Sequence, residues 1–244
     1  MKYPLSRRSS EFLWITVAAL LLGSGASRAL AQETPVDLQA IIKETQQTAQ
    51  SPSAMTMVWW IPEAFIHAAI STNPDMTEEK RETFLKPLRS YTIIIVIDAK
   101  IGPIGALTYT PSTDLAASVR LKDNAGNLYT PIDNAQINSD AQSFVAIMKP
   151  LMASMLGPLG QNMNFFVFPR RGKGDGVIAD ERKEGLFYVE VGKKEFRWRL
   201  PLNSVLTPKT CPTCKETLSG AYKYCPYDGT KLPETAAPQA TPKP

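Results

Sequence analysis

Tyr91-Thr92-Ile93-Ile94-Ile95-Val96-Ile97 is the stretch that decides the fold, and it is almost entirely β-branched and apolar. β-Branched side chains pack well on a pleated strand, and the run is too short to be read as a buried helix. Because no polar residue alternates with the apolar ones, both faces of such a strand have to be covered. The run therefore predicts the central strand of a sheet that is buried on both sides.

A β-hairpin is predicted at residues 186–200, where the apolar pattern changes from continuous to alternating. A two-residue turn at Gly192-Lys193 would place Val189 opposite Phe196. The apolar side chains then share one face and the charged ones share the other, which indicates a sheet with one buried wall and one solvated wall. The apolar face would hold Phe187, Val189, Val191, Phe196, Trp198 and Leu200.

Shorter periodic segments complete the set of predicted elements. Helices are expected at residues 36–49, 62–70, 77–85 and 141–156, and further strands at residues 106–110, 119–122, 128–130 and 164–168. About seven short strands separated by polar turns favour an antiparallel sheet or sandwich. We therefore expect an α+β fold, with a helical N-terminal region at 32–90 and an antiparallel β-rich, sandwich-like domain at 91–205 that carries the inserted helix 141–156.

The first 31 residues have the three parts of a secretory signal peptide: a basic start, an apolar run at 12–22, and small residues ending in Ala29-Leu30-Ala31. The apolar run has about half the length that a bilayer-spanning helix needs, which favours a cleaved signal over an anchor. The Ser6-Arg7-Arg8 start also fits a twin-arginine signal, so the export route stays open. We expect an exported protein, periplasmic or secreted, with no membrane span after cleavage.

Cleavage after Ala31 would make the protein nearly neutral. The chain has a formal charge of +4, and residues 1–31 hold four basic side chains and one acid, so removing them leaves 4 − 3 = +1. Binding to nucleic acid rests on many lysine and arginine contacts with phosphate. The low charge therefore argues against nucleic acid as a partner, and equally against an anionic membrane surface.

All three cysteines lie close together near the C-terminus, at positions 211, 214 and 225. Cys211-Pro212-Thr213-Cys214 and Cys225-Pro226-Tyr227-Asp228 match each other position by position, with Asp228 in the place of a fourth cysteine. A tetrahedral zinc site needs four ligands, and two tight turns joined by a short hairpin supply them with little loss of chain entropy. The pattern predicts a metal site formed by Cys211, Cys214, Cys225 and Asp228.

Residues 211–232 resemble the zinc-ribbon family, including Gly229 after the last ligand and the aromatic Tyr224 before the third cysteine. The resemblance implies a structural zinc ion that folds a small module at 206–232. It departs from the family pattern at Asp228, because a carboxylate is a less common zinc ligand than a thiolate. Water or the single histidine, His67, could complete the coordination sphere instead. The residues that follow, 233–244, are rich in proline and predict a disordered tail.

A disulfide is the rival interpretation of the cysteines, since exported proteins meet an oxidising compartment. Three cysteines leave one unpaired, and a bridge between Cys211 and Cys214 would close a small, strained loop typical of redox proteins. A thioredoxin-like centre would need a helix that begins inside the motif, and residues 210–215 show no helical pattern. The sequence favours metal, and a disulfide remains the alternative to test.

The main domain contains no sequence motif that indicates its function. Its leading interpretation is an exported, non-enzymatic protein with an envelope interaction or scaffold role and an unidentified protein partner. A periplasmic enzyme with a site around Glu63, His67 and Asp98 is the second hypothesis, because Glu63 and His67 would lie one helical turn apart. Metal handling, with the cysteine module as a labile store, is the third.

Overall fold

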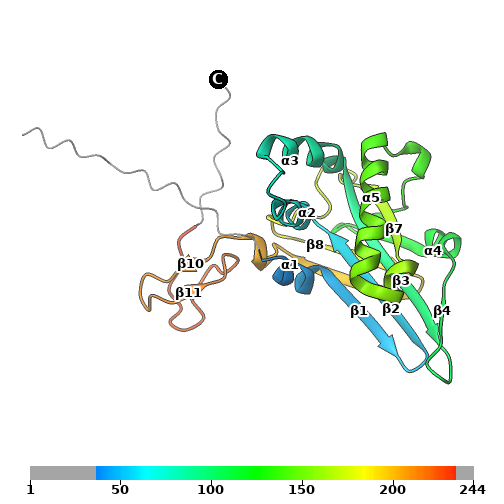
Figure 1. The fold of residues 1–244 in the computed structure, drawn as a ribbon. Helices are drawn as coiled ribbons and strands as arrows, with labels where there is room; N and C mark the ends of the chain where they lie inside the picture. Colours follow the sequence, from blue (N-terminus) through cyan, green and yellow to red (C-terminus); the bar gives the residue numbers. More distant parts are fainter. Residues whose placement is uncertain (1–36, 235–244) are drawn as a thin grey trace, which may run out of the picture. The chain divides into compact units, whose positions relative to one another are not determined.

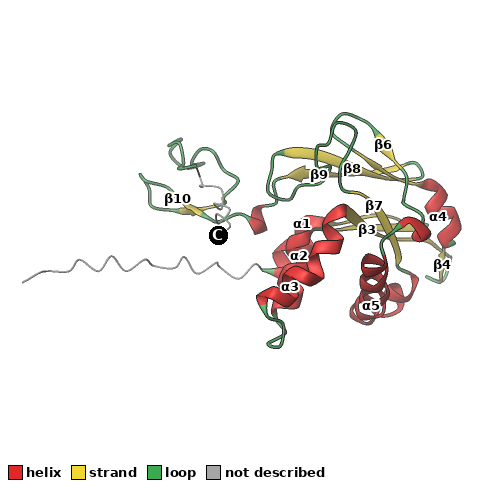
Figure 2. Cartoon of the chain, turned by 90° about the horizontal axis from the view of Figure 1, so that it is seen from above, coloured by secondary structure: helices red, strands yellow, loops and turns green. Residues whose placement is uncertain are grey.

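This computed structural model describes residues 37–234, so the predicted signal peptide at 1–31 and tail residues 235–244 lie outside the described part. The larger part of the described chain forms three layers, in which two antiparallel sheets pack on each other and helices cover the outer face of one sheet (Figure 2). The α+β class and the antiparallel sheets expected from the sequence are confirmed.

The first sheet is built around the strand that the isoleucine run predicts. Its strand order is β1-β2-β3-β4, and β7 also pairs with β3. Ile94, Ile95, Val96 and Ile97 in β3 are fully buried, which confirms a strand covered on both sides. The five strands are β1 (Gln46–Ser51), β2 (Ala54–Ile61), β3 (Tyr91–Ile101), β4 (Leu107–Tyr109) and β7 (Asn164–Pro169).

The second sheet has the order β6-β5-β8-β9 and contains the predicted hairpin. Val189 pairs with Phe196 and Phe187 with Trp198, so the register expected from the alternation is confirmed. The apolar face is buried while Arg197 on the opposite face is exposed. The four strands are β5 (Val119–Lys122), β6 (Leu128–Tyr129), β8 (Gly185–Val191) and β9 (Lys194–Leu200).

Two adjacent tryptophans in β2 show how one strand contacts both the helix layer and the second sheet. Because successive side chains of a strand point to opposite faces, Trp59 meets the helix layer and Trp60 meets the second sheet. The ring of Trp59 lies edge-on to Phe65 at 5.2 Å, and that of Trp60 lies edge-on to Phe187 of β8 at 4.9 Å. Both tryptophans are buried, so they belong to the core.

Thr45 is a buried polar junction between these layers. Its hydroxyl accepts a hydrogen bond from Nε1 of Trp59 at 3.1 Å, and its carbonyl accepts one from Nε1 of Trp198 at 3.0 Å. Both indole groups are buried and would otherwise leave an unpaired donor in the core. One residue thus satisfies the polar atoms of two aromatic side chains from different sheets.

All the helices except α4 lie over the first sheet, as Figure 1 shows, and their bounds mostly follow the prediction. The prediction of a helix over 36–49 is wrong in its second half, because the helix ends at Thr45 and Gln46 begins strand β1. Residues 46–51 have no apolar period of their own, and pairing with β2 makes them extended. The sequence also gave no signal for α4. The helices are α1 (Leu38–Thr45), α2 (Glu63–Ser71), α3 (Glu78–Leu85), α4 (Ser112–Ser118) and α5 (Ser139–Leu156).

Helix α5 is the inserted helix, and Pro150 lies inside it. Phe144, Met148 and Met152 are buried along one side, where Phe144 meets Phe84 of α3 at 5.4 Å. Ile147 on another side is 62% exposed. Among the described residues, no helix has the length and apolarity to cross a bilayer.

The C-terminal module, residues 206–232, has a separate and much smaller core. A two-stranded sheet pairs β10 (Lys209–Thr210) with β11 (Thr217–Leu218). Four buried side chains make up the core of this module: Cys211, Leu218, Cys225 and Leu232. Two of the four are cysteines, so apolar burial alone supplies little stability here.

Candidate metal centre

The two predicted turns have the same backbone structure, and we call them the first knuckle (residues 211–216) and the second knuckle (residues 225–230). In the first, the N–H of Cys211 donates to Glu216 at 2.9 Å and the N–H of Lys215 donates to Cys211 at 3.1 Å. In the second, Cys225 donates to Thr230 at 2.8 Å and Gly229 donates to Cys225 at 3.0 Å. The two knuckles therefore match in their backbone hydrogen bonds as well as in their sequences.

Both knuckles place their fifth residue in the left-handed region of backbone conformation. Lys215 has a φ of 64° and Gly229 a φ of 72°. Glycine adopts this conformation readily, whereas a lysine is strained there. The alignment of the knuckles pairs these two positions, so Gly229 is the sequence signal for the conformation of Lys215.

The four predicted ligands are brought together by these knuckles. Donor atoms of Cys211, Cys214, Cys225 and Asp228 all lie within 4.8 Å of one another. The Sγ atoms of Cys214 and Cys225 are 3.6 Å apart, and Sγ of Cys211 is 3.4 Å from Oδ2 of Asp228. Around a tetrahedral zinc ion these separations would be about 3.8 Å between two sulfurs and about 3.5 Å between sulfur and oxygen. These two distances are close to the values for ligands of a single ion.

Asp228 is oriented so that one carboxylate oxygen is free for a metal. The N–H of Thr230 donates to Oδ1 at 2.8 Å, and that oxygen lies 3.8 Å from Sγ of Cys211. Oδ2 is the closer of the two oxygens to this sulfur, at 3.4 Å. The arrangement suits a carboxylate that binds through one oxygen while a backbone hydrogen bond fixes the other.

Backbone donors favour the charged form of two of the four ligands. The N–H and hydroxyl of Thr230 hold the pKa of Asp228 well below its usual range. Burial would raise the pKa of the Cys211 thiol, but N–H groups of Cys214 and Thr213 outweigh it and hold that pKa below its ordinary value. Since a metal binds the thiolate and the carboxylate, both shifts favour ligation.

Cys214 shows the opposite shift, because the other donors surround it. The N–H of Glu216 lowers the pKa of its thiol, but burial together with Cys211, Cys225 and Asp228 raises it to about 12. Four acidic groups so close together cannot all lose their protons without a counter-charge. A bound cation would supply that charge, so ligation and deprotonation would be coupled at this site.

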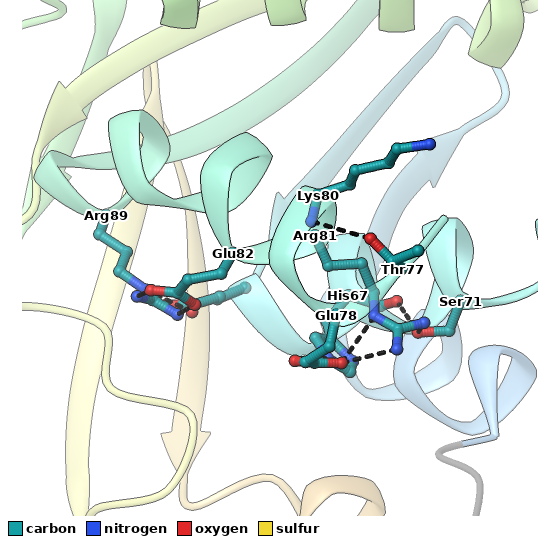
Figure 3. A network of polar contacts seen from close by, with 9 residues as sticks. His67, Ser71, Thr77, Glu78, Lys80, Arg81, Glu82 and Arg89 are labelled. Carbon is teal, nitrogen blue, oxygen red and sulfur yellow. Dashed lines mark hydrogen bonds and ion pairs between the residues drawn. The ribbon is translucent and has the colours of Figure 1, made fainter. Parts of the chain in front are cut away.

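The alternative partners for these cysteines are not assembled around them. All three cysteines are free, and 3.6 Å between Cys214 and Cys225 is far longer than the bond of about 2.05 Å in a disulfide. His67 lies on α2, with Nε2 4.0 Å from Oε1 of Glu78 on α3, and it does not belong to the cluster (Figure 3). The structure therefore groups Asp228, and not His67, with the cysteines.

Glu63, His67 and Asp98 of the enzyme hypothesis each have different partners. Glu63 accepts from Arg89 at 2.7 Å and lies 3.4 Å from Arg170. Arg89 also binds Glu82, in a part of the network separate from the pair of His67 and Glu78 (Figure 3).

Asp98 of β3 takes part in polar contacts that link the two sheets. It accepts hydrogen bonds from Thr56 and from Thr110, the latter at 2.6 Å, and it lies 3.4 Å from Nζ of Lys194. Burial alone would raise the pKa of Asp98, but these threonines and Lys194 lower it below its ordinary value. The pattern is that of a charged group held between strands, and neither Glu63 nor His67 is among its partners.

Comparisons with protein-family models, with curated proteins and with solved structures find no match to this chain. The likeness of residues 211–232 to zinc ribbons is therefore carried by the residues and the geometry of the two knuckles.

Proposed function

We propose that this chain is an exported, non-enzymatic protein whose C-terminal module is folded by one structural zinc ion and binds a protein partner. The observation that carries the proposal is the convergence of four donors at tetrahedral spacing on two equivalent knuckles. The basic start, apolar run and small residues within positions 1–31 support the proposed location, in the periplasm or outside the cell.

The donor set favours zinc over other common ions. Thiolates are soft ligands that suit zinc, copper(I) and iron–sulfur clusters, whereas calcium and magnesium prefer oxygen throughout. Three thiolates and one carboxylate in a tetrahedral arrangement fit zinc. With four protein ligands no position stays open for a substrate water, which supports a structural role over a catalytic one.

The size of the module supports the same conclusion. Apart from its two buried cysteines, its core holds only Leu218 and Leu232 among the described residues. Segments with so little apolar surface usually need a metal or a disulfide to fold. Coordination would therefore supply most of the folding free energy of the module.

The surface of the module supports a binding role. Tyr222, Tyr224 and Tyr227 are 45%, 60% and 73% exposed. Tyrosine is enriched at protein interfaces because it combines a large apolar face with a polar tip and loses little side-chain entropy on binding. Three such side chains on a metal-fixed module favour a protein partner.

The metal part of the proposal is tested on the full chain, purified after export under conditions that do not strip metal. Native mass spectrometry and elemental analysis should find one zinc per chain. Asp228→Asn should weaken zinc binding by about 10- to 100-fold in a chelator competition, since it removes a charged ligand. Thr217→Ala, an exposed position of β11, is the matched control and should leave affinity unchanged. Metal-free protein with a Cys211–Cys214 bridge would overturn the proposal.

The binding part is tested by cross-linking in the envelope. A photoreactive residue in place of Tyr227 should give one discrete protein adduct, and the same residue in place of the exposed Ile147 of α5 is the control. Equal labelling from both positions would remove the module as the docking surface and leave the zinc assignment standing.

A further inference from the structure

Two turns lie side by side at one end of the first sheet, and we call them the sheet tip. The β1–β2 turn is centred on Pro52 and Ser53, and the β3–β4 turn spans Gly102 to Ala106. The N–H of Ile101 donates to the carbonyl of Ser53 at 2.9 Å, which ties the turns together. Figure 1 shows both turns at the same end of the long strands, at the lower right.

The β3–β4 turn is closed by two backbone hydrogen bonds, and its conformation does not require an isoleucine. Gly105 donates to the carbonyl of Gly102 at 3.0 Å, and Gly102 donates to that of Ala106 at 2.8 Å. Pro103 presets the second position of the turn, and Gly105, with a φ of 80°, takes the left-handed one. The third position usually holds a small polar residue, yet here it is Ile104.

Ile104 is held out into solvent. This residue is 93% exposed. Leu107 beside it is 38% exposed, and Pro52 and Pro103 are exposed as well. The sheet tip therefore presents exposed apolar side chains on two hydrogen-bonded turns.

The two turns of the tip carry no charge themselves, and the nearest charged residue along β3 is the exposed Lys100. No Asp, Glu, Lys or Arg occurs between Lys100 and Asp114, and none occurs between Glu44 and Glu63. The tip can therefore leave water without desolvating an ion, which would be the largest penalty against burial. By contrast, the other strongly exposed isoleucine, Ile147, has Lys149 two residues away.

We propose that the sheet tip inserts Ile104 into the interface of a phospholipid bilayer. A convex point of two short turns is too small for an ordinary protein interface, which buries about 800 Å² on each partner. Shallow insertion needs only a few apolar side chains and no complementary groove. Because the tip is uncharged and the mature chain is nearly neutral, the attraction is apolar and does not depend on anionic lipid.

The test is flotation of the full chain, after signal removal, with vesicles of pure phosphatidylcholine. Wild-type protein should float with the vesicles, and 0.5 M salt should not release it. At that ionic strength the Debye length is about 4 Å, so the salt screens electrostatic attraction and leaves apolar attraction in place. Ile104→Asp should reduce the bound fraction by about tenfold or more, because it removes the apolar contact and adds a charge. Ile147→Asp is the matched control and should float like wild type.

A second measurement separates insertion from a folding defect. Ile104→Trp should retain binding and show tryptophan quenching by lipid brominated near the headgroup, whereas Ile147→Trp should show no added quenching. Failure of the wild type to float, equal flotation of Ile104→Asp, or flotation only with anionic vesicles at low salt would each overturn the proposal. So would a photo-cross-link from position 104 to protein and not to lipid. Chelation of the zinc should leave flotation unchanged, because the tip lies in the main domain.

Discussion

The main domain and the C-terminal module of this chain are held together by different forces. The main domain buries a continuous cluster of tryptophan, phenylalanine and aliphatic side chains between two sheets and a helix layer. The module buries two leucines and two cysteines. Apolar burial scales with the size of a domain, so a large fold can rely on it and a segment of a few tens of residues cannot. The comparison teaches that the cysteines serve as the substitute core of the smaller part.

The largest expected effect comes from removing one ligand. Cys225→Ser should release the metal and unfold the module, because structural zinc supplies roughly 10 kcal/mol or more of apparent folding free energy in small modules. Hydrogen exchange should show lost protection at residues 209–232 and unchanged protection in strand β3. Loss of protection in both regions would mean that the two parts fold as one unit.

The reverse experiment weakens the main domain alone. Trp60 is 2% exposed and packs on Phe187, so Trp60→Ala should lower the free energy of unfolding of this domain by about 3–5 kcal/mol. Urea denaturation would measure the change, and zinc content should stay at one per chain. A fall in zinc content at low urea would contradict the separation of the two stabilising forces.

A substitution with a smaller expected effect tests whether the two knuckles are equivalent. Lys215→Gly should stabilise the metal-bound module by about 1 kcal/mol, because it relieves the left-handed strain that Gly229 avoids in the second knuckle. The rate of zinc loss to a chelator would report the gain. Thr217→Gly in β11 is the control. It should speed zinc loss to the chelator, since glycine weakens a strand.

The smallest effect concerns a buried acid in the main domain. Glu181 is 7% exposed, and burial raises the pKa of its carboxyl above the ordinary value. The folded state therefore binds the proton more tightly than the unfolded state, so stability falls as the pH rises from the unfolded pKa through the folded one. Glu181→Gln should stabilise the domain at pH 8 and change little at pH 4, measured by thermal melting. Equal effects at both values would show that the side chain is not titrating.

The secondary structure of segments with a strong apolar pattern could be predicted from the sequence. The β-branched run of β3 and the alternation of β8 and β9 fixed strand, face and register without knowledge of their partners. Residues 46–51 could not be read in this way, because Gln-Gln-Thr-Ala-Gln-Ser has no apolar period and becomes a strand only by pairing with β2. The placement of α4 likewise depends on contacts that a local pattern does not contain.

The grouping of the four donors was predictable because ligand chemistry restricts both residue type and spacing. Three cysteines and one aspartate in two matching turns could meet at one ion whatever the rest of the chain does. The conformation of Lys215 and the hydrogen bond from Thr230 to Asp228 were not predicted, since both follow from the closed knuckle. The sheet tip was also missed, because an exposed isoleucine looks like any core residue until the fold shows where it lies.

The junction at Thr45 has a consequence for the order of events during synthesis. Its carbonyl is separated from its tryptophan partner by 153 positions, and Glu44 caps residues 203 and 204 at similar range. The earliest elements to emerge from a ribosome or a translocation channel thus finish their polar contacts only when nearly the whole domain has followed them. Until then the face of β2 that carries Trp60 lacks the second sheet that covers it, and such late closure leaves apolar surface exposed while the chain is being made.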